Sequence, residues 1–239
     1  GVTAIIPHGG NIFLEKVMGA AVVLNGFGKS VGLVQIEELG TIETPIILTN
    51  TFSVGTAVNA LTKYMLKDNP DIGTSTGTVN CVVGECNDGK LNDIRVQHVN
   101  ESHIFEAISA SNRNFEEGSV GGGTGMCCLG VKGGIGSASR ILEIDGQEYT
   151  LGALVMTNFG SPGNLVIGGK HIDTKVNFDS INYEKKDKGS VIIVIATDIP
   201  LNERQLKRVC KRSSIALGRC GSYMGNGSGD IAIGFTTSN

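Results

Sequence analysis

One Gly-Ser pair in this sequence stands where the chain could make its own nucleophile. Gly189-Ser190 joins a charged stretch, 182–189, directly to the most hydrophobic run, 191–196. A hydroxyl residue that attacks the preceding carbonyl frees itself as a new N-terminus, and a glycine before the bond eases the backbone approach. The freed α-amine, with a reference pKa of roughly 7.7–8.0, can act as the base, so no histidine is required. The simpler alternative on this local pattern is that Ser190 only begins a strand.

Other familiar catalytic patterns do not occur in the sequence. There is no GxSxG elbow, and the 4 histidines have no spacing that pairs them with a cysteine or forms a metal site. The 6 cysteines include no CxxC pair, and Cys127-Cys128 are adjacent, which suits neither zinc nor an ordinary disulfide. We expect reduced, mostly buried thiols in a cytoplasmic protein, with no metal and no cofactor.

Glycine is the anomaly of the composition, at 35 of 239 residues. The run Gly121-Gly122-Gly123-Thr124-Gly125 is typical of a loop that cradles phosphate, as in the tubulin-like GTPases. A strand at 126–131, rather than a helix, is expected to follow, and without a helix N-terminus an anion site is weakened. A nucleotide-binding protein is therefore kept as the alternative function.

The charge balance gives the chain no general attraction to polyanions. The formal net charge is −3 and the isoelectric point is about 5.8, so we expect neither a nucleic-acid nor a membrane partner. No run approaches the roughly 20 apolar residues that a membrane-spanning helix needs, and no secretion signal opens the chain. Because the sequence starts at Gly1 with a strand-like run, we expect the natural chain to begin upstream.

The hydrophobic pattern predicts short strands that alternate with a few helices and form a single domain. Asn202 and Gln205 have the spacing of a capping box at the start of the best-marked helix. Strands are expected at 1–6, 20–24, 46–49, 79–83, 151–156 and 191–196. Helices are expected over 53–69, 100–108 and 203–217.

The chain closely resembles the L-aminopeptidase/D-esterase family, which contains D-aminopeptidases and β-peptidyl aminopeptidases. The most specific matches lie around the Gly-Ser pair, at 189–201, and downstream of it, at 205–208 and 225–231. Other matches follow in order through almost the whole chain. These are 26–30, 49–55, 91–93, 120–126, 132–140 and 158–160.

The resemblance implies an αββα four-layer sandwich, similar to N-terminal-nucleophile hydrolases but connected differently. It implies one hydrolase domain over 1–239 that cuts itself into an α chain, 1–189, and a β chain, 190–239. The implied activity is release of an N-terminal residue from a short peptide, amide or ester that carries a free amino group, through an acyl-enzyme. Relatives assemble as homo-oligomers, often tetramers, so we expect the same here.

The match also assigns residue roles. Ser190 corresponds to the nucleophile, and the self-cleaved bond falls between Gly189 and Ser190. Ser228 and Asp230 correspond to the hydroxyl and the acid beside the nucleophile; two apart on an extended segment, they can face the same side. Asn158 corresponds to the side chain of the oxyanion hole, for which an amide N–H is suited.

Glu85 corresponds to the acidic residue near the free amino group of the substrate. Around 85–89, some relatives carry a tyrosine that assists the oxyanion; this sequence has none there, which leaves the second oxyanion donor open. A further alternative is a non-catalytic relative that folds without cutting itself. Taken singly, Asn158 has the alternative of a turn cap, and Glu85 that of a surface carboxylate.

Overall fold

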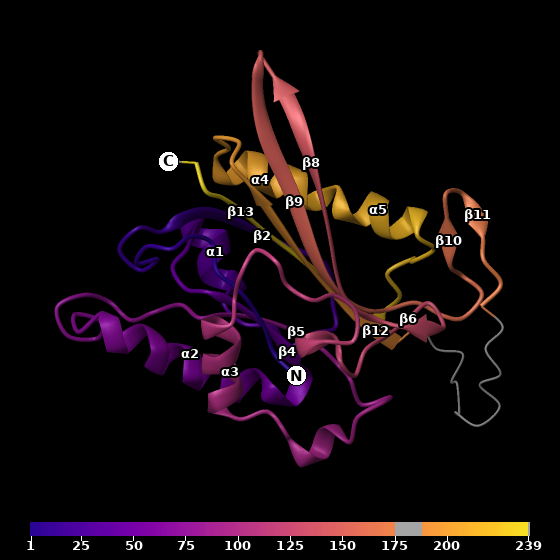
Figure 1. Ribbon diagram of the computed structural model, residues 1–239, viewed down its shortest axis with the longest axis horizontal. Coiled ribbons are helices and arrows are strands. Elements are labelled where there is room, and N and C mark those ends of the chain that lie inside the picture. The colour runs from indigo at the N-terminus through magenta and orange to yellow at the C-terminus, as the bar shows by residue number, and fades with distance from the viewer. Residues whose placement is uncertain (175–187, 239) are drawn as a thin grey trace.

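Two β-sheets face each other and helices cover their outer sides (Figure 1). The computed structural model describes residues 1–174 and 188–238. The larger sheet has six strands in the order β3-β2-β13-β12-β9-β8, and the smaller has the order β1-β4-β5. The six-stranded sheet consists of β2 (Val17–Gly26), β3 (Thr41–Ile42), β8 (Gly134–Ile144), β9 (Gln147–Asn158), β12 (Lys188–Thr197) and β13 (Gly227–Thr236). The smaller sheet consists of β1 (Thr3–Ile5), β4 (Ile46–Asn50) and β5 (Val82–Cys86).

Helices form the two outer layers. α2 (Val54–Asp68) and α3 (Glu101–Ser109) pack against the smaller sheet, and α4 (Glu203–Lys211) and α5 (Ser213–Arg219) pack against the larger one. The remaining elements are α1 (Leu33–Leu39), the 3-10 turns η1 (Thr51–Ser53), η2 (Ile94–Val96) and η3 (Gly121–Gly123), and two small hairpins. The hairpins are β6 (Cys127–Cys128) with β7 (Val131–Lys132), and β10 (Val166–Ile167) with β11 (Lys170–His171).

The main core lies between the sheets, and strand alternation determines which residues enter it. Along β12, Ile192 and Val194 pack toward β4 and β5, whereas Val191 and Ile193 pack toward α4 and α5. β12 is therefore buried on both faces, which explains its unbroken hydrophobic run. Ser190 is two residues before Ile192, so its side chain points to the same face of β12, toward the smaller sheet.

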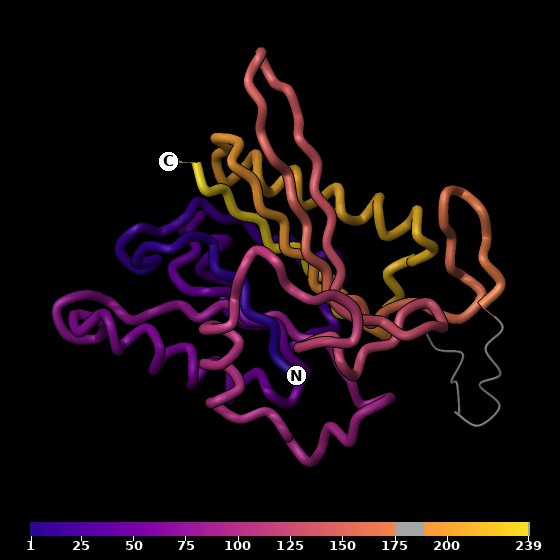
Figure 2. Tube along the Cα trace, viewed as in Figure 1, coloured from indigo at the N-terminus to yellow at the C-terminus, as the bar shows by residue number. Residues whose placement is uncertain are grey.

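β8 and β9 continue beyond the rest of the molecule as a two-stranded arm (Figure 2). At their other end, the two strands pair within the sheet, and β9 reaches β12 there. The arm is exposed along most of β8. The part of β9 that pairs with β12 therefore belongs to the central sheet, and the tip of the arm does not.

The sandwich predicted from the resemblance is confirmed, with three local differences. The expected helix over 203–217 is two helices, because the N–H of Arg212 bonds to the carbonyl of Val209, three residues back, and the chain restarts at Ser213. The strand expected at 79–83 lies at 82–86. The strand expected at 126–131 is instead the β6–β7 hairpin, whose turn holds Leu129 at φ 49°.

The capping box predicted at Asn202 is present. Its side chain accepts from the N–H of Gln205 at 2.9 Å, and the Gln205 side chain accepts from the N–H of Asn202 at 3.0 Å. Of the charged stretch 182–189, expected to be an exposed loop, residues 182–187 lie outside the described residues, and 188–189 belong to β12. No described helix combines the length and apolar character needed to cross a membrane.

Candidate active site

Ser190 lies near the start of β12, between two strands that carry other predicted site residues. β12 pairs with β13 in parallel and with β9 in antiparallel register. Ser190 stands opposite Gly229 on one side and Asn158 on the other. The β-sheet thus brings together three segments that are separated by about 30 to 70 residues in sequence.

The Ser190 side chain is enclosed in the core. It is 3% exposed, and its hydroxyl makes no hydrogen bond of normal geometry with any described residue. The neighbouring Cys86 thiol, fully buried, lies against it, and burial raises the pKa of Cys86 well above its ordinary value. Cys86 is thus a neutral neighbour of the hydroxyl, not a thiolate base. Sequence reasoning missed this contact because it crosses between the sheets.

Gly189 is required by close packing against β9. A Cβ at this position would lie 2.6 Å from the carbonyl oxygen of Asn158 and 2.7 Å from the Cα of Phe159. Gly189 does not have a positive φ, so the requirement is space and not a left-handed backbone. A glycine was expected before the scissile bond for its conformational freedom. The structure supplies a different reason, which is the approach of two backbones.

Ser228 and Asp230 point to the same side of β13, as their spacing predicted. The Ser228 hydroxyl donates to Asp230 Oδ1 at 2.7 Å, and both side chains are fully buried. Gly189 pairs with Ser228 and Val191 with Asp230, so the two residues flank the level of Ser190 on the adjacent strand. Successive side chains of a strand point to opposite faces of the sheet. Ser228 and Asp230 therefore lie on one face, and Gly229 and its partner Ser190 have the orientation of the other face.

Asn25 fixes the start of β13 and was missed in the sequence. It pairs with Asp230 across β2 and β13, next to a register shift. Its side-chain amide donates to the carbonyl of Gly225 at 3.1 Å and to that of Ser228. The amide thereby ties down the turn that leads into Ser228.

The Asn158 side chain is held on both sides by backbone groups. Its Oδ1 accepts from the N–H of Cys127 at 3.0 Å, and its Nδ2 donates to the carbonyl of Asn87 at 2.8 Å. These two contacts fix the orientation of the amide, with the nitrogen facing the end of β5. A side-chain amide carries a second N–H, and for Asn158, which stands opposite Ser190, no acceptor of it is found among the described residues.

Glu85 is a buried carboxylate with neutral donors. It is 3% exposed; Oε1 accepts from the N–H of Lys29 at 2.7 Å and Oε2 accepts from the Thr51 hydroxyl. No cationic side chain within 1–174 or 188–238 forms an ion pair with it. The alternative that Glu85 is a surface carboxylate is therefore wrong. Its expected place beside the amino group of a substrate stays a prediction.

The glycine-rich loop at 121–125 is explained by packing. A Cβ on Gly122 would lie 2.9 Å from the carbonyl oxygen of Leu48, and one on Gly123 would lie 2.6 Å from the backbone nitrogen of Ile135. Gly121 has φ 49° and starts the η3 turn. Backbone of Leu48 and Ile135 fills the space beside Gly122 and Gly123, so glycine is needed here for the loop to pack closely against the strands. This packing gives no support to a phosphate-binding loop.

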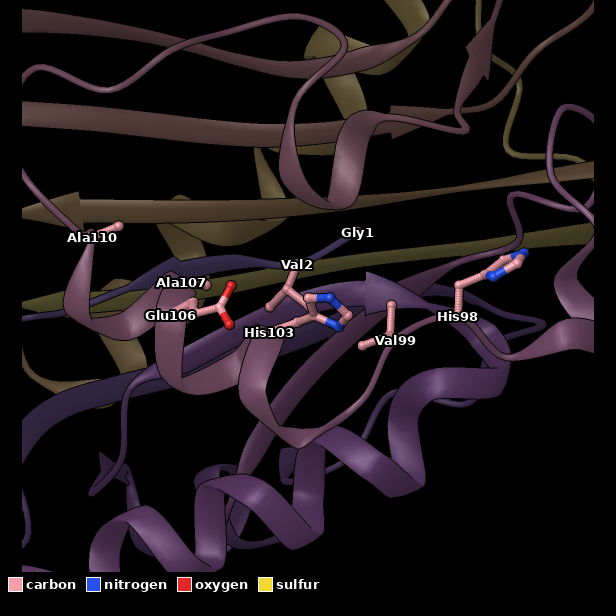
Figure 3. Close-up of a pocket in the computed structure, with 8 residues that line it drawn as sticks. All are labelled: Gly1, Val2, His98, Val99, His103, Glu106, Ala107 and Ala110. Atoms are coloured by element: carbon pink, nitrogen blue, oxygen red, sulfur yellow. The ribbon is translucent and has the colours of Figure 1, made fainter.

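A cavity of about 450 Å³ opens elsewhere, between the start of the chain and α3 (Figure 3). Val2, His103 and Glu106 project into it, and none of the predicted site residues lines it. Across the two described segments, no group of three or more His, Cys, Asp or Glu side chains is arranged to hold a metal ion.

Two packed sheets covered by helices, with a Gly-Ser pair at the start of a central strand, make this a mixed α/β sandwich. Comparison with known proteins identifies the family within that class. The chain belongs to peptidase family S58, whose model matches residues 1–239.

The curated relatives are peptidases. The chain is 38% identical over 253 residues to the β-peptidyl aminopeptidase BapA of Sphingosinicella microcystinivorans, covering 100% of this chain and 63% of that protein. It is 35% identical over 250 residues to BapA of Sphingosinicella xenopeptidilytica, with 100% and 62% covered. The chain thus spans less than two thirds of the length of these relatives.

Solved structures share the fold. The PH0078 protein of Pyrococcus horikoshii OT3 has a TM-score of 0.92 and 56% identity, over 100% of this chain and 66% of its own. The L-aminopeptidase D-Ala-esterase/amidase of Ochrobactrum anthropi has a TM-score of 0.86 and 36% identity, over 100% and 65%. That enzyme is described as a prototype of the serine aminopeptidases and as a new variant of the Ntn hydrolase fold.

Proposed function

We propose that this protein is a self-processing serine aminopeptidase whose nucleophile is Ser190. The observation that carries the proposal is the position of Ser190 on the central strand β12. Asn158 stands directly opposite it on one neighbouring strand, and the Ser228–Asp230 pair is adjacent on the other. A nucleophile, an amide donor and an acid–hydroxyl pair are the groups that acyl transfer requires.

The proposed maturation starts from the uncut strand. Ser190 Oγ attacks the carbonyl carbon of Gly189, the Gly189–Ser190 amide bond breaks, and the hydroxyl proton is transferred to the departing nitrogen. This acyl shift frees the Ser190 amine and leaves an ester between Gly189 and Ser190 Oγ. Water then hydrolyses the ester, which frees the Gly189 carboxylate and restores the Ser190 hydroxyl. The two products, 1–189 and 190–239, stay together because β12 and β13 are central strands of one sheet.

In turnover, the freed α-amine accepts the proton of its own hydroxyl as Ser190 attacks the substrate carbonyl. The proton then passes to the leaving amine, and water releases the acyl group. We propose that the Asn158 amide donates to the oxyanion. The Ser228–Asp230 pair orients the α-amine and stabilises its protonated form through the carboxylate charge.

We propose that the substrates are short peptides, amides or esters with a free N-terminal amino group, held at Glu85. A buried carboxylate that has no cationic partner among the described residues is suited to an ammonium group of the substrate. The relatives named β-peptidyl aminopeptidase support this substrate class. Assembly into a homo-oligomer belongs to the same proposal, and light scattering of the full-length protein measures it.

Mass spectrometry under denaturing conditions tests the proposal. The full-length protein should give two fragments that meet at Gly189-Ser190, and the mixture should hydrolyse alanine p-nitroanilide. A single intact chain without amidase activity would instead support a non-catalytic relative. Stabilisation by GTP or ATP, with no response to peptide amides, would support a nucleotide-binding protein.

A further inference from the structure

Thr51 lies beside Glu85 and has no assigned role. It is the first residue after β4, whose Asn50 pairs with Cys86 and whose Thr49 pairs with Glu85. The Thr51 hydroxyl donates to Glu85 Oε2. The hydroxyl thus reaches back to a carboxylate on the neighbouring parallel strand.

The position of Thr51 is fixed by the residue before it. Asn50 is buried and accepts from the N–H of Ser53 at 3.0 Å, which caps η1. The Asn50 amide also donates to Asp88 Oδ2 at 3.2 Å. Both ends of the Asn50 side chain are thus engaged, and these hydrogen bonds hold the backbone next to Thr51 in place.

The hydrogen bonding of Thr51 determines what else its oxygen can do. A threonine hydroxyl has one proton and two acceptor lone pairs. The proton is donated to Glu85, so the oxygen remains able to accept. Unlike Glu85, Thr51 is partly exposed. A ligand with N–H donors could therefore reach the Thr51 oxygen and the carboxylate together.

We propose that Thr51 is a second ligand of the substrate ammonium group, beside Glu85. Its hydroxyl orients the carboxylate by donating to Oε2 and accepts one N–H of the ammonium. The backbone N–H of Lys29 at 2.7 Å from Oε1 holds the other carboxylate oxygen. This inference rests on the proposed function, because it presumes that Glu85 binds the amino group.

The test compares a substrate that has the amino group with one that lacks it. Alanine p-nitroanilide and propionyl p-nitroanilide differ only in the amine. With Thr51→Val, which keeps the shape and removes the hydroxyl, KM for alanine p-nitroanilide should rise about tenfold, as for loss of a hydrogen bond to a charged group. We expect kcat to change by less than about twofold and kcat/KM for the propionyl compound to stay the same.

Two further variants make the result specific. Thr51→Ser should restore the wild-type KM, because it keeps the hydroxyl. Thr56→Val, on the adjoining helix α2, makes the same change at a threonine whose hydroxyl makes no hydrogen bond to another described residue, and it should leave both substrates unaffected. Circular dichroism and self-cleavage report folding, and Thr51→Ala is the replacement if Thr51→Val does not fold.

The outcomes separate this inference from the proposed function. If Thr51→Val slows both substrates equally, or leaves KM for the alanine compound unchanged while Glu85→Gln raises it, the role of Thr51 is structural and the inference is wrong. If the wild-type protein does not prefer the amino substrate, or Glu85→Gln leaves that preference intact, the proposed site at Glu85 fails and the inference fails with it.

Discussion

The Ser228 hydroxyl and the Asp230 carboxylate form a 2.7 Å hydrogen bond inside a strand that runs parallel to the one carrying Ser190. Both groups are buried, so the carboxylate acts in an environment where charge is weakly screened. Because β12 and β13 are adjacent parallel strands, the pair lies beside the backbone of Ser190. The Ser190 side chain points to the other face of the sheet. That arrangement fits a role in holding the α-amine that cleavage would release.

Ser190→Ala should give an uncut chain without amidase activity, because self-cleavage and turnover use the same hydroxyl. Intact-mass measurement and hydrolysis of alanine p-nitroanilide check both steps. Ser161→Ala, in another Gly-Ser pair, is the matched control and should be cut normally. A Ser190→Ala protein still processed at Gly189 would show that another residue attacks.

Asp230→Asn should move the acidic limb of the kcat/KM profile to lower pH. The carboxylate favours the protonated α-amine and so raises its pKa; losing the charge lowers that pKa, and the free base becomes available at lower pH. The maximal rate should fall, because the ammonium formed during acylation is less stabilised. Asp145→Asn, in the turn of the β8–β9 arm, removes the same charge at a distance and should change neither quantity.

Asn158→Asp should lower kcat by about 10² to 10³, the usual effect of losing an oxyanion donor. The carboxylate has nearly the same shape and can still accept from the N–H of Cys127, but it cannot donate to the carbonyl of Asn87 or to an oxyanion. Stopped-assay kinetics of the processed enzyme measure the effect. An unchanged kcat would leave Asn158 as a structural contact between β9 and the end of β5.

Gly189→Ala should destabilise the protein by about 1–3 kcal/mol and slow self-cleavage, because its Cβ would meet the backbone of Asn158 and Phe159. Gly136→Ala is the control: it also lies in a strand of the larger sheet, but a Cβ there meets nothing within 4 Å. Urea unfolding of both variants in the Ser190→Ala background isolates stability from cleavage. Equal effects at the two positions would contradict the close-packing explanation.

The Cys210 thiol should make the fold less stable at alkaline pH. Burial raises its pKa from 9.0 to about 12, so between these values the unfolded chain loses a proton that the folded chain keeps. The contribution of Cys210 is therefore fully present below pH 9 and is lost as pH rises toward 12, by roughly 1 kcal/mol per pH unit.

Unfolding midpoints at successive pH values check this expectation. Cys210→Ala should show a shallower alkaline loss than the wild type, even though the smaller side chain lowers stability at neutral pH. Cys220→Ala, at an exposed thiol, should keep the wild-type slope. Parallel slopes for all three proteins would exclude Cys210 as a source of the pH dependence.

Local sequence determined much of what surrounds the site. The hydrophobic run of β12, the capping box at Asn202 and the spacing of Ser228 and Asp230 depend on residues a few positions apart, where strand and helix geometry leave few choices. The family motifs then indicated which Gly-Ser pair to examine. The glycine loop shows the limit of such patterns, because the same residues can cradle a phosphate or admit a neighbouring backbone.

Only the tertiary structure placed Cys86 against Ser190, Asn25 at the turn before Ser228, and Thr51 beside Glu85. These contacts join strands that are distant in the chain, and their partners depend on sheet order and register. A shift of one residue in register would send each of these side chains to the opposite face. That register is set by the packing of the whole sandwich core, which no local stretch of the sequence contains.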